Sequence, residues 1–448
     1  MSLDRTRVPA SGAAPAPTVP RPHRLRLDNG MSLVSVNRDW LPEATLSLVL
    51  PAGAHSTAAG TAGLASLMAK VLPEGASGRG AQEMAVWIDG LGLQLRVSAG
   101  YDSLVLRVRT LSEQLEPTLD VLAALALEPD FLVAEVERCK AERLDGIRRL
   151  RDEPVEVAAD LLAELLYGDH PYGRLPRGRL DTVEPLGRRD LAGFHRDRFS
   201  PRAATLAACG DLPDGFEDLV VARFGNWHGP DVDPRPAASV QQVSSPGTVL
   251  VDRPGSGQSE IRIAGIGLRR GDPDEPAARV TNAILGGLFN SRLNMNLRED
   301  KGWTYGARSA LTLRRARGPL TLRAAVDTPV TVDAVREMLA EAGRMRRSLP
   351  DEGEMRTASG ALTRSLPLRF ETSRQIVRTL VEQVVYDLPD DYWNSFPGRI
   401  EAVSPREVRE MAVRLLDPGL FVVLVVGDAE AVLPDLESLG SVTLREAP

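Results

Sequence analysis

The strongest constraint on the fold of this chain is a pattern in its first half that returns in its second half. The segment ATLSLVLPAG, which starts at Ala44, corresponds to SEIRIAGIGL, which starts at Ser259. ATLAACGD at Ala204 likewise corresponds to FVVLVVGD at Phe421, so the two offsets are 215 and 217 residues. Because the order of strand-like and helix-like segments between the anchors also matches, the sequence predicts a duplicated α+β domain. A chain of 448 residues is also too long for one ordinary hydrophobic core.

Changes in composition predict the domain boundaries. Residues 1–22 are rich in Pro, Ala and Ser, which is typical of a flexible lead-in. Residues 229–247 contain four prolines and no sustained period, which indicates a linker. We therefore expect one domain at 23–228 and a second at 248–448, with the natural ligand site in a cleft or chamber between them.

Local patterns in the first domain predict individual elements. Asn29-Gly30 joins two alternating runs and is a strong hairpin signal. A third strand is expected at Ala44–Leu50, followed by a helix at Thr61–Leu72. The apolar stripe of this helix has helical spacing and consists of Leu64, Leu67, Met68 and Val71.

The composition excludes several classes of protein. With 43% hydrophobic and 26% charged residues the chain is not disordered throughout, and no run of eighteen apolar residues predicts a membrane span. The N-terminal residues lack the apolar core of a secretory signal, so we expect a cytoplasmic location, with the periplasm as the alternative. The net charge of −7 argues against a nucleic-acid partner. Arginine supplies 51 of the 54 basic residues, which we interpret as a codon bias that leaves most of them on the surface or in ion pairs.

The residues that usually build metal or nucleophile sites are scattered. No two of the five histidines lie within twenty residues of each other, and no HExxH, HxxEH or CxxC pattern occurs. We therefore expect no zinc held by this chain alone, and we interpret each histidine as a surface or packing residue. Cys139 and Cys209 lie in contexts that predict burial, and no GxSxG elbow is present.

The most distinctive segment is ILGGLFNSRLNMNLREDKGWTYGARS, which runs from residue 284 to residue 309. It predicts a helix in which Gly286 and Gly287 permit the close approach of another backbone. The helix is expected to end at Lys301-Gly302, and a strand is expected to start at Trp303.

Two polar residues of this segment, Arg298 and Tyr305, attract attention because of their chemistry. Arg298 falls in the last helical turn and Tyr305 near the start of the strand. A bidentate cation and a phenol on either side of a turn can converge on one spot, where they could bind a peptide carbonyl or stabilise a developing oxyanion. The residues alone leave a second interpretation open, in which Arg298 forms an ion pair and Tyr305 caps the turn.

At this segment the sequence resembles the M16 metallopeptidase family, which includes pitrilysin, insulin-degrading enzyme and the mitochondrial processing peptidases. The resemblance covers nearly the whole chain after residue 23. It includes the Asn-Gly hairpin, AGLASLMAKVLPEG at Ala62, LYGDHPYGRLPRGRL at Leu166, FSPRAATLAACGDL at Phe199, DRPGSGQSEI at Asp252 and the Arg–Tyr segment. It implies an M16-type metallohydrolase fold of two homologous α+β lobes, each a mainly antiparallel sheet with helices packed on one face.

The resemblance also implies that this chain departs from the family at its zinc motif. The two histidines of the inverted motif HxxEH fall on Ser66 and Lys70, and its glutamate falls on Ala69, so all three are replaced. These positions lie opposite the apolar stripe of the predicted helix. The family's third ligand, a glutamate on a later helix, should fall near residues 144–146, where Asp145 is the only acid.

Members of the family of about this length often work as pairs, in which one subunit carries zinc and the other lacks it. The resemblance therefore implies a non-zinc subunit of a bacterial-type heterodimeric M16B peptidase, with no metal of its own and inactive alone. Arg298 would hold a backbone carbonyl of the peptide and Tyr305 would help to stabilise the oxyanion. The Zn²⁺ of the partner would polarise the carbonyl and the partner's glutamate would activate water.

A structural role is the alternative to this peptidase function. It would resemble that of the core subunits of the respiratory bc1 complex, which mainly hold an assembly together. The presence of both Arg298 and Tyr305 favours the substrate-binding role.

Overall fold

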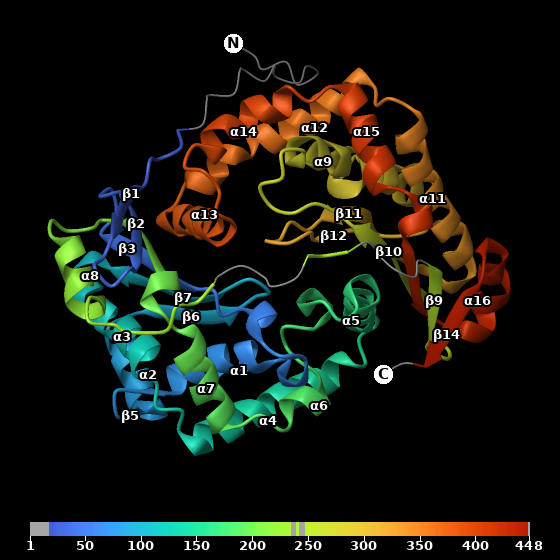
Figure 1. Cartoon of the computed structure of the whole chain (residues 1–448). Helices are drawn as coiled ribbons and strands as arrows, with labels where there is room; N and C mark the ends of the chain where they lie inside the picture. Colours follow the sequence, from blue (N-terminus) through green and yellow to red (C-terminus); the bar gives the residue numbers. More distant parts are fainter. Residues whose placement is uncertain (1–17, 234–238, 242–246, 447–448) are drawn as a thin grey trace, which may run out of the picture.

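The computed structural model describes residues 18–233, 239–241 and 247–446. Within these ranges the chain forms two lobes, each built on a six-stranded sheet (Figure 1). Most of the predicted lead-in 1–22 and the greater part of the predicted linker 229–247 lie outside the described residues. In the described ranges no helix is both long enough and apolar enough to cross a membrane.

The elements of the first lobe precede the predicted linker. Its strands are β1 (His23–Arg26), β2 (Ser32–Asn37), β3 (Glu43–Leu50), β6 (Gln94–Ala99), β7 (Leu104–Leu111) and β8 (Thr205–Gly210), with a small ribbon of β4 (Gly75–Ala76) and β5 (Arg79–Gly80). Its helices are α1 (Leu64–Val71), α2 (Ala81–Gly90), α3 (Leu115–Leu127), α4 (Val133–Leu150), α5 (Pro154–Tyr167), α6 (Leu180–Val183), α7 (Arg188–Arg198) and α8 (Phe216–Phe224).

The second lobe repeats this plan after the predicted linker. Its strands are β9 (Gly247–Asp252), β10 (Gln258–Ile266), β11 (Ala307–Leu311), β12 (Pro319–Asp327), β13 (Val422–Gly427) and β14 (Val442–Glu446). Its helices are α9 (Glu275–Asn282), α10 (Arg292–Asn294), α11 (Thr331–Arg347), α12 (Glu352–Arg364), α13 (Ser373–Tyr386), α14 (Tyr392–Glu401), α15 (Pro405–Leu415) and α16 (Ala429–Leu436).

The strand order shows the duplication directly. The first sheet runs β1-β2-β8-β3-β7-β6, and the second, read in the same direction, runs β14-β9-β13-β10-β12-β11. Thr45 of β3 pairs with Cys209 of β8. At the offsets of 215 and 217 residues found in the sequence, Glu260 of β10 pairs with Val426 of β13. The predicted duplication is therefore confirmed down to the register of its central strand pair.

Most neighbouring strands are antiparallel, as predicted, and the hairpin at Asn29-Gly30 joins β1 to β2. Each sheet also contains a parallel pair, β2 with β8 and β9 with β13. Parallel strands need a long crossover, and here the helices of each lobe lie between the two strands in the sequence. The lobes differ at one edge, because β1 is antiparallel to β2 whereas β14 is parallel to β9.

Each lobe covers the inner face of the other lobe's sheet with one helix (Figure 1). Helix α5 of the first lobe packs on β10 and β13 of the second, and α13 of the second lobe packs on β3 and β8 of the first. Val157 and Leu162 of α5 share an apolar cluster with Leu424 of β13, and Ile376 of α13 shares one with Val49 of β3. Each aliphatic side chain buried in this way contributes about 2 kcal/mol.

The helices of each lobe pack on one face of its own sheet, as predicted, and the exchanged helix covers the opposite face. The central strands are buried along nearly their whole length because both of their faces are covered. The edge strand β6 instead alternates between exposed and half-buried residues. An amphipathic pattern shows that a helix has a buried face, but it does not show which lobe covers that face.

Buried polar contacts fix the two lobes to each other. Tyr172 is fully buried, and its hydroxyl donates to the carboxylate of Asp102. The same hydroxyl accepts from the backbone N–H of Ala316 at 3.1 Å, and the second oxygen of Asp102 accepts from the N–H of Arg315 at 3.2 Å. Burial, followed by the charge of Asp102, raises the pKa of Tyr172, so the phenol keeps the proton that it donates.

We expect Tyr172→Phe to lower the free energy of unfolding by about 1–3 kcal/mol, because it leaves the N–H of Ala316 and one oxygen of Asp102 without a partner. Urea denaturation followed by circular dichroism measures this change. Tyr386 is the matched control, because its hydroxyl forms no hydrogen bond within the described part of the chain. Tyr386→Phe should change the free energy by less than about 0.5 kcal/mol. Equal losses of unfolding free energy in the two variants would contradict this account of the polar contacts between the lobes.

Candidate functional site

The Arg–Tyr segment is less regular than the sequence predicts. The helical run breaks after Gly287, where Leu288 is extended with φ −115° and ψ 161°. It resumes in α10 and in a π-helical turn at Met295–Asp300. The strand β11 starts at Ala307, so the prediction of a strand from Trp303 was wrong. Two consecutive glycines weaken the helix, and the aromatic residues that suggested an earlier strand lie in an irregular turn.

Gly286 permits the close backbone approach that the sequence predicts. A Cβ atom at this position would lie 2.3 Å from the backbone nitrogen of Ser309 on β11. The Ser309 hydroxyl donates to the side-chain oxygen of Asn282 at 2.8 Å. Gly302, with φ +67°, ends the helical run as predicted. The start of the segment is therefore packed directly against the strand β11.

Two buried asparagines, which the sequence analysis missed, brace the segment from inside. The Asn294 amide donates to the carbonyl of Phe289 at 2.7 Å, and its oxygen accepts from the N–H of Ala307 at 3.3 Å. The Asn296 amide donates to a carboxylate of α11 at 2.7 Å, and its oxygen accepts from Lys301 Nζ at 2.9 Å. The sequence signal that could have found them is an asparagine in an otherwise apolar helical run, because a buried amide requires hydrogen-bond partners.

Arg298 and Tyr305 lie on the outer surface of this braced segment. Tyr305 is 97% exposed, and the Arg298 side chain is 37% exposed. The Arg298 guanidinium lies 4.6 Å from the centroid of the Phe289 ring, and its Nε lies 3.5 Å from the carboxylate of Glu299. An exposed ion pair of this kind contributes at most about 1 kcal/mol. The planar face of Arg298 is thus held by an aromatic ring that the sequence analysis did not single out.

These contacts bear on the two interpretations of the pair. The ion pair of Arg298 exists, but Tyr305 is too exposed to cap the turn. No hydrogen bond joins the two side chains in the described part of the chain. The structure places both on one segment, with a fully exposed phenol and a partly exposed guanidinium.

Helix α1 contains the three positions at which the resemblance places the zinc motif. Ser66 and Ala69 are only 8% and 6% exposed. Lys70 forms an ion pair with Glu142 of α4 at 2.6 Å, and Arg143 of the same helix donates to the carbonyl of Ser66 at 3.1 Å. Helix α4 therefore covers the face that the sequence leaves opposite the apolar stripe.

The position of the third zinc ligand contains no ligand either. Asp145 is 63% exposed and pairs with Arg148 at 2.7 Å. The acid that reaches α1 is Glu142, whose pKa is held below its usual value first by the hydrogen bond from Lys70. Two cations, Lys70 at a motif position and Arg143 beside Ser66, would repel a divalent metal ion. The residues present here do not fit zinc.

The other side chains that could bind a metal ion are also separated from one another. No group of three or more His, Cys, Asp or Glu side chains is placed to hold a metal within residues 18–233, 239–241 and 247–446. His55 and His195 each contact a backbone carbonyl at 2.8 Å, and burial lowers the pKa of both. Cys139 and Cys209 are buried and free, and burial raises the pKa of each thiol to about 11, so neither is a reactive thiolate.

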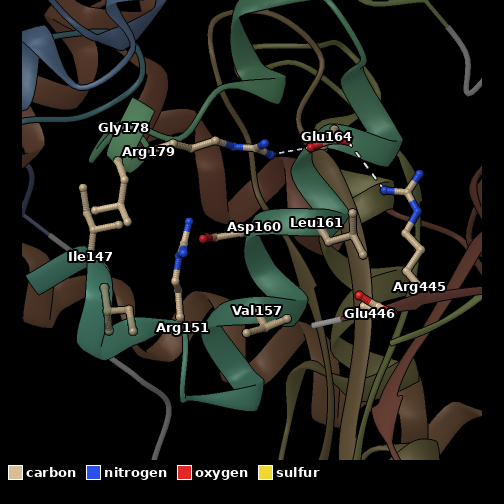
Figure 2. Close-up of a pocket in the computed structure, with 12 residues that line it drawn as sticks. Ile147, Arg151, Val157, Asp160, Leu161, Glu164, Gly178, Arg179, Arg445 and Glu446 are labelled. Carbon is tan, nitrogen blue, oxygen red and sulfur yellow. Dashed lines mark hydrogen bonds and ion pairs between the residues drawn. The ribbon is translucent and has the colours of Figure 1, made fainter. Parts of the chain in front are cut away.

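A separate hollow of about 240 Å³ lies between α4, α5, α6 and β14 (Figure 2). Its wall is apolar at Ile147 and Val157. At its rim Glu164 interacts with both Arg179 and Arg445, as the dashed lines show. Three arginines and three acids line the hollow, so its formal charges balance. It contains none of the predicted site residues.

Comparison with known proteins now decides the family. The sequence profile described as "Insulinase (Peptidase family M16)" matches residues 33–177, and the profile described as "Peptidase M16 inactive domain" matches residues 185–362. The chain belongs to the M16 peptidase family. The resemblance found in the sequence is therefore confirmed, and so is its two-lobed fold.

Individual relatives agree with this assignment. An uncharacterized zinc protease of Mycobacterium bovis is 28% identical over 88% of this chain and 91% of its own length. The mitochondrial-processing peptidase subunit beta of Rattus norvegicus is 21% identical over 98% of this chain and 91% of its own length. The crystal structure of a peptidase M16 inactive domain from Pseudomonas fluorescens has a TM-score of 0.84 at 25% identity, covering 92% of this chain and 99% of that one. A protease from Helicobacter pylori has a TM-score of 0.86 at 16% identity, covering 92% and 100%.

We expect the purified chain to bind less than one equivalent of zinc and to hydrolyse no peptide alone, because Ser66, Ala69 and Lys70 supply no set of zinc ligands. Metal analysis after dialysis, together with a peptidase assay, measures both properties. An M16 protein with an intact HxxEH motif, treated in the same way, is the control. One tightly held zinc per chain with chelator-sensitive activity would contradict this expectation.

Proposed function

We propose that this chain is the non-catalytic, substrate-binding subunit of a heterodimeric M16 zinc peptidase. The observation that supports this most strongly is a contrast between two sites of the same chain. The zinc-motif positions are packed against α4 and flanked by cations. Arg298 and Tyr305 are instead presented to solvent on a segment braced by buried asparagines.

In this proposal each of the two residues acts on a bound peptide. Arg298 donates from its planar fork to a backbone carbonyl, and its stacking on Phe289 limits the orientations of the guanidinium. Tyr305 donates its hydroxyl to the oxyanion that develops at the attacked carbonyl. The zinc site belongs to the partner subunit, so this chain binds and orients the peptide.

The comparisons support the proposal at a coarser level. The profile matched by residues 185–362 is described as an inactive domain, and one relative is named as a subunit of a processing peptidase. A paired arrangement also suits a chain that holds a candidate carbonyl-binding pair but no zinc ligands. The alternative is a structural subunit without a role in proteolysis, in which Arg298 serves only its local contacts with Phe289 and Glu299.

Mixing this chain with a zinc-bearing M16 partner should produce a complex whose peptidase rate exceeds that of either subunit. Size-exclusion chromatography with light scattering measures assembly, and cleavage of a quenched fluorescent peptide measures the rate. A complex that forms without any gain in rate would favour the structural alternative.

Within that complex, Tyr305→Phe should lower kcat by about 10²–10³-fold, the usual cost of losing one oxyanion donor. Arg298→Lys should mainly raise KM, because it keeps the charge but loses the planar fork. Steady-state kinetics on the reconstituted complex separates these effects, and melting curves verify the fold.

Arg356→Lys is the matched control for Arg298→Lys, because Arg356 is a 71% exposed helical arginine with a comparable surface ion pair. It should leave kcat and KM unchanged. Wild-type turnover in both site variants, with unchanged melting temperatures, would show that the pair has no part in proteolysis.

A further inference from the structure

An arginine-lined groove lies where α13 of the second lobe covers the sheet of the first. It has a volume of about 550 Å³ and opens between β7 and the N-terminal half of α13. Besides Arg109, four arginines gather here, and we refer to these four as the arginine cluster: Arg107, Arg374 and Arg378 in the groove, and Arg96 beside Arg107 on the edge strand β6.

The cluster lacks compensating carboxylates. Glu43 is the acid in the groove, and its carboxylate accepts from the neighbouring Arg109. No ion pair reaches any member of the cluster within the described part of the chain. This concentration of positive charge occurs in a chain whose net charge is −7.

The positive charges of the other three members of the cluster all act on Arg107. It lies directly opposite Arg96 in the β6–β7 pair, and its Nε donates to Ser47 Oγ at 3.1 Å. Burial lowers the pKa of Arg107, and the nearby charges of Arg374 and Arg378 lower it further. Like charges placed directly opposite each other on a sheet are destabilising, so a stable fold alone does not favour this arrangement.

The duplicated lobe has the same opposed pair of arginines on its sheet, but acids lie beside that row. There Arg323 of β12 lies between Arg308 and Arg262, the counterpart of the row formed by Arg96, Arg107 and Ser47. Arg262 pairs with Glu260 at 2.7 Å. The charge of Glu156, on the covering helix α5, also attracts it.

The first lobe has no such acids at the corresponding row. Its covering helix α13 instead presents Arg374 and Arg378. Charges on an edge strand discourage aggregation, which accounts for Arg96, but this reason does not apply to two arginines on a packed helix.

We propose that the arginine cluster binds a carboxylate-rich stretch of an extended peptide, so that acidic peptides are the preferred substrates of the complex. Guanidinium groups bind carboxylates through paired, charge-assisted hydrogen bonds. Arg374 and Arg378 are one helical turn apart, about 6 Å along the axis. Alternate side chains of an extended peptide are spaced by about 6.6 Å, so two acids at i and i+2 match them. The preference for acidic substrates rests on the function proposed above.

Binding of labelled peptides to the full chain tests the cluster without requiring the partner. The probe is a fluorescein-labelled peptide with glutamate at alternate positions, and its counterpart has glutamine at those positions. By fluorescence anisotropy at low salt, the glutamate peptide should bind about tenfold more tightly, and the difference should shrink as salt is added. Arg374→Gln with Arg378→Gln should abolish the difference. Equal binding of the two peptides to the wild-type chain would overturn the proposal.

The control variant removes the same charge elsewhere, by Arg356→Gln with Arg406→Gln, two residues that are 71% and 79% exposed. This control variant should keep the preference for the glutamate peptide. If both double variants lose that preference equally, the effect is one of bulk charge and the proposal is overturned. Arg374→Glu with Arg378→Glu should reverse the preference towards a lysine peptide, which a misfolded variant would not do. A single-stranded oligonucleotide that binds at the cluster more tightly than the glutamate peptide would also overturn it.

Cleavage assays with the reconstituted complex separate this inference from the proposed function. Higher kcat/KM for the glutamate peptide than for the glutamine peptide is expected. Equal cleavage of the two peptides would contradict the preference for acidic substrates and leave the proposed function intact. If the glutamate peptide binds through α13 but no mixture of this chain with a zinc-bearing partner cleaves it, the proposed function is contradicted and the cluster remains a peptide-binding site.

Discussion

The reciprocal exchange of α5 and α13 is the interaction on which the rest of this structure depends. Each helix belongs by sequence to one lobe and covers the sheet of the other. The central strands of both sheets are buried on both faces as a result, so neither lobe can move away without exposing its own sheet. Tyr172 and Asp102 add directional hydrogen bonds to this apolar contact, which fixes the relative orientation of the lobes as well as their proximity.

The two halves of this duplicated chain share this frame but differ in chemistry. In the first lobe Lys70 and Arg143 join α1 to α4, and the surface of α1 offers no set of zinc ligands. The second lobe holds a rigid segment on which Arg298 and Tyr305 remain exposed. Helix α13 presents Arg374 and Arg378 over β7 of the first sheet.

Sequence reasoning reached the duplication and its register because repeated strand patterns are local and their offsets can be counted. It also found the close approach at Gly286, since only glycine fits there. It missed the start of β11, because Trp303 and Tyr305 have strand-like side chains but lie in a turn that Asn294 and Asn296 brace. The exchanged helices and the arginine cluster were beyond its reach, because both depend on which distant segments meet, and residue spacing does not contain that information.

The central claim is that one peptide touches both this chain and a zinc-bearing partner during cleavage. Photocrosslinking tests it most directly, with a substrate peptide that carries benzoylphenylalanine next to the scissile bond and a complex whose activity is blocked by a chelator. Mass spectrometry then locates the labelled residues. The account predicts labels in residues 289–307 of this chain as well as in the partner. Labels confined to the partner, in a complex that still binds the peptide, would contradict it.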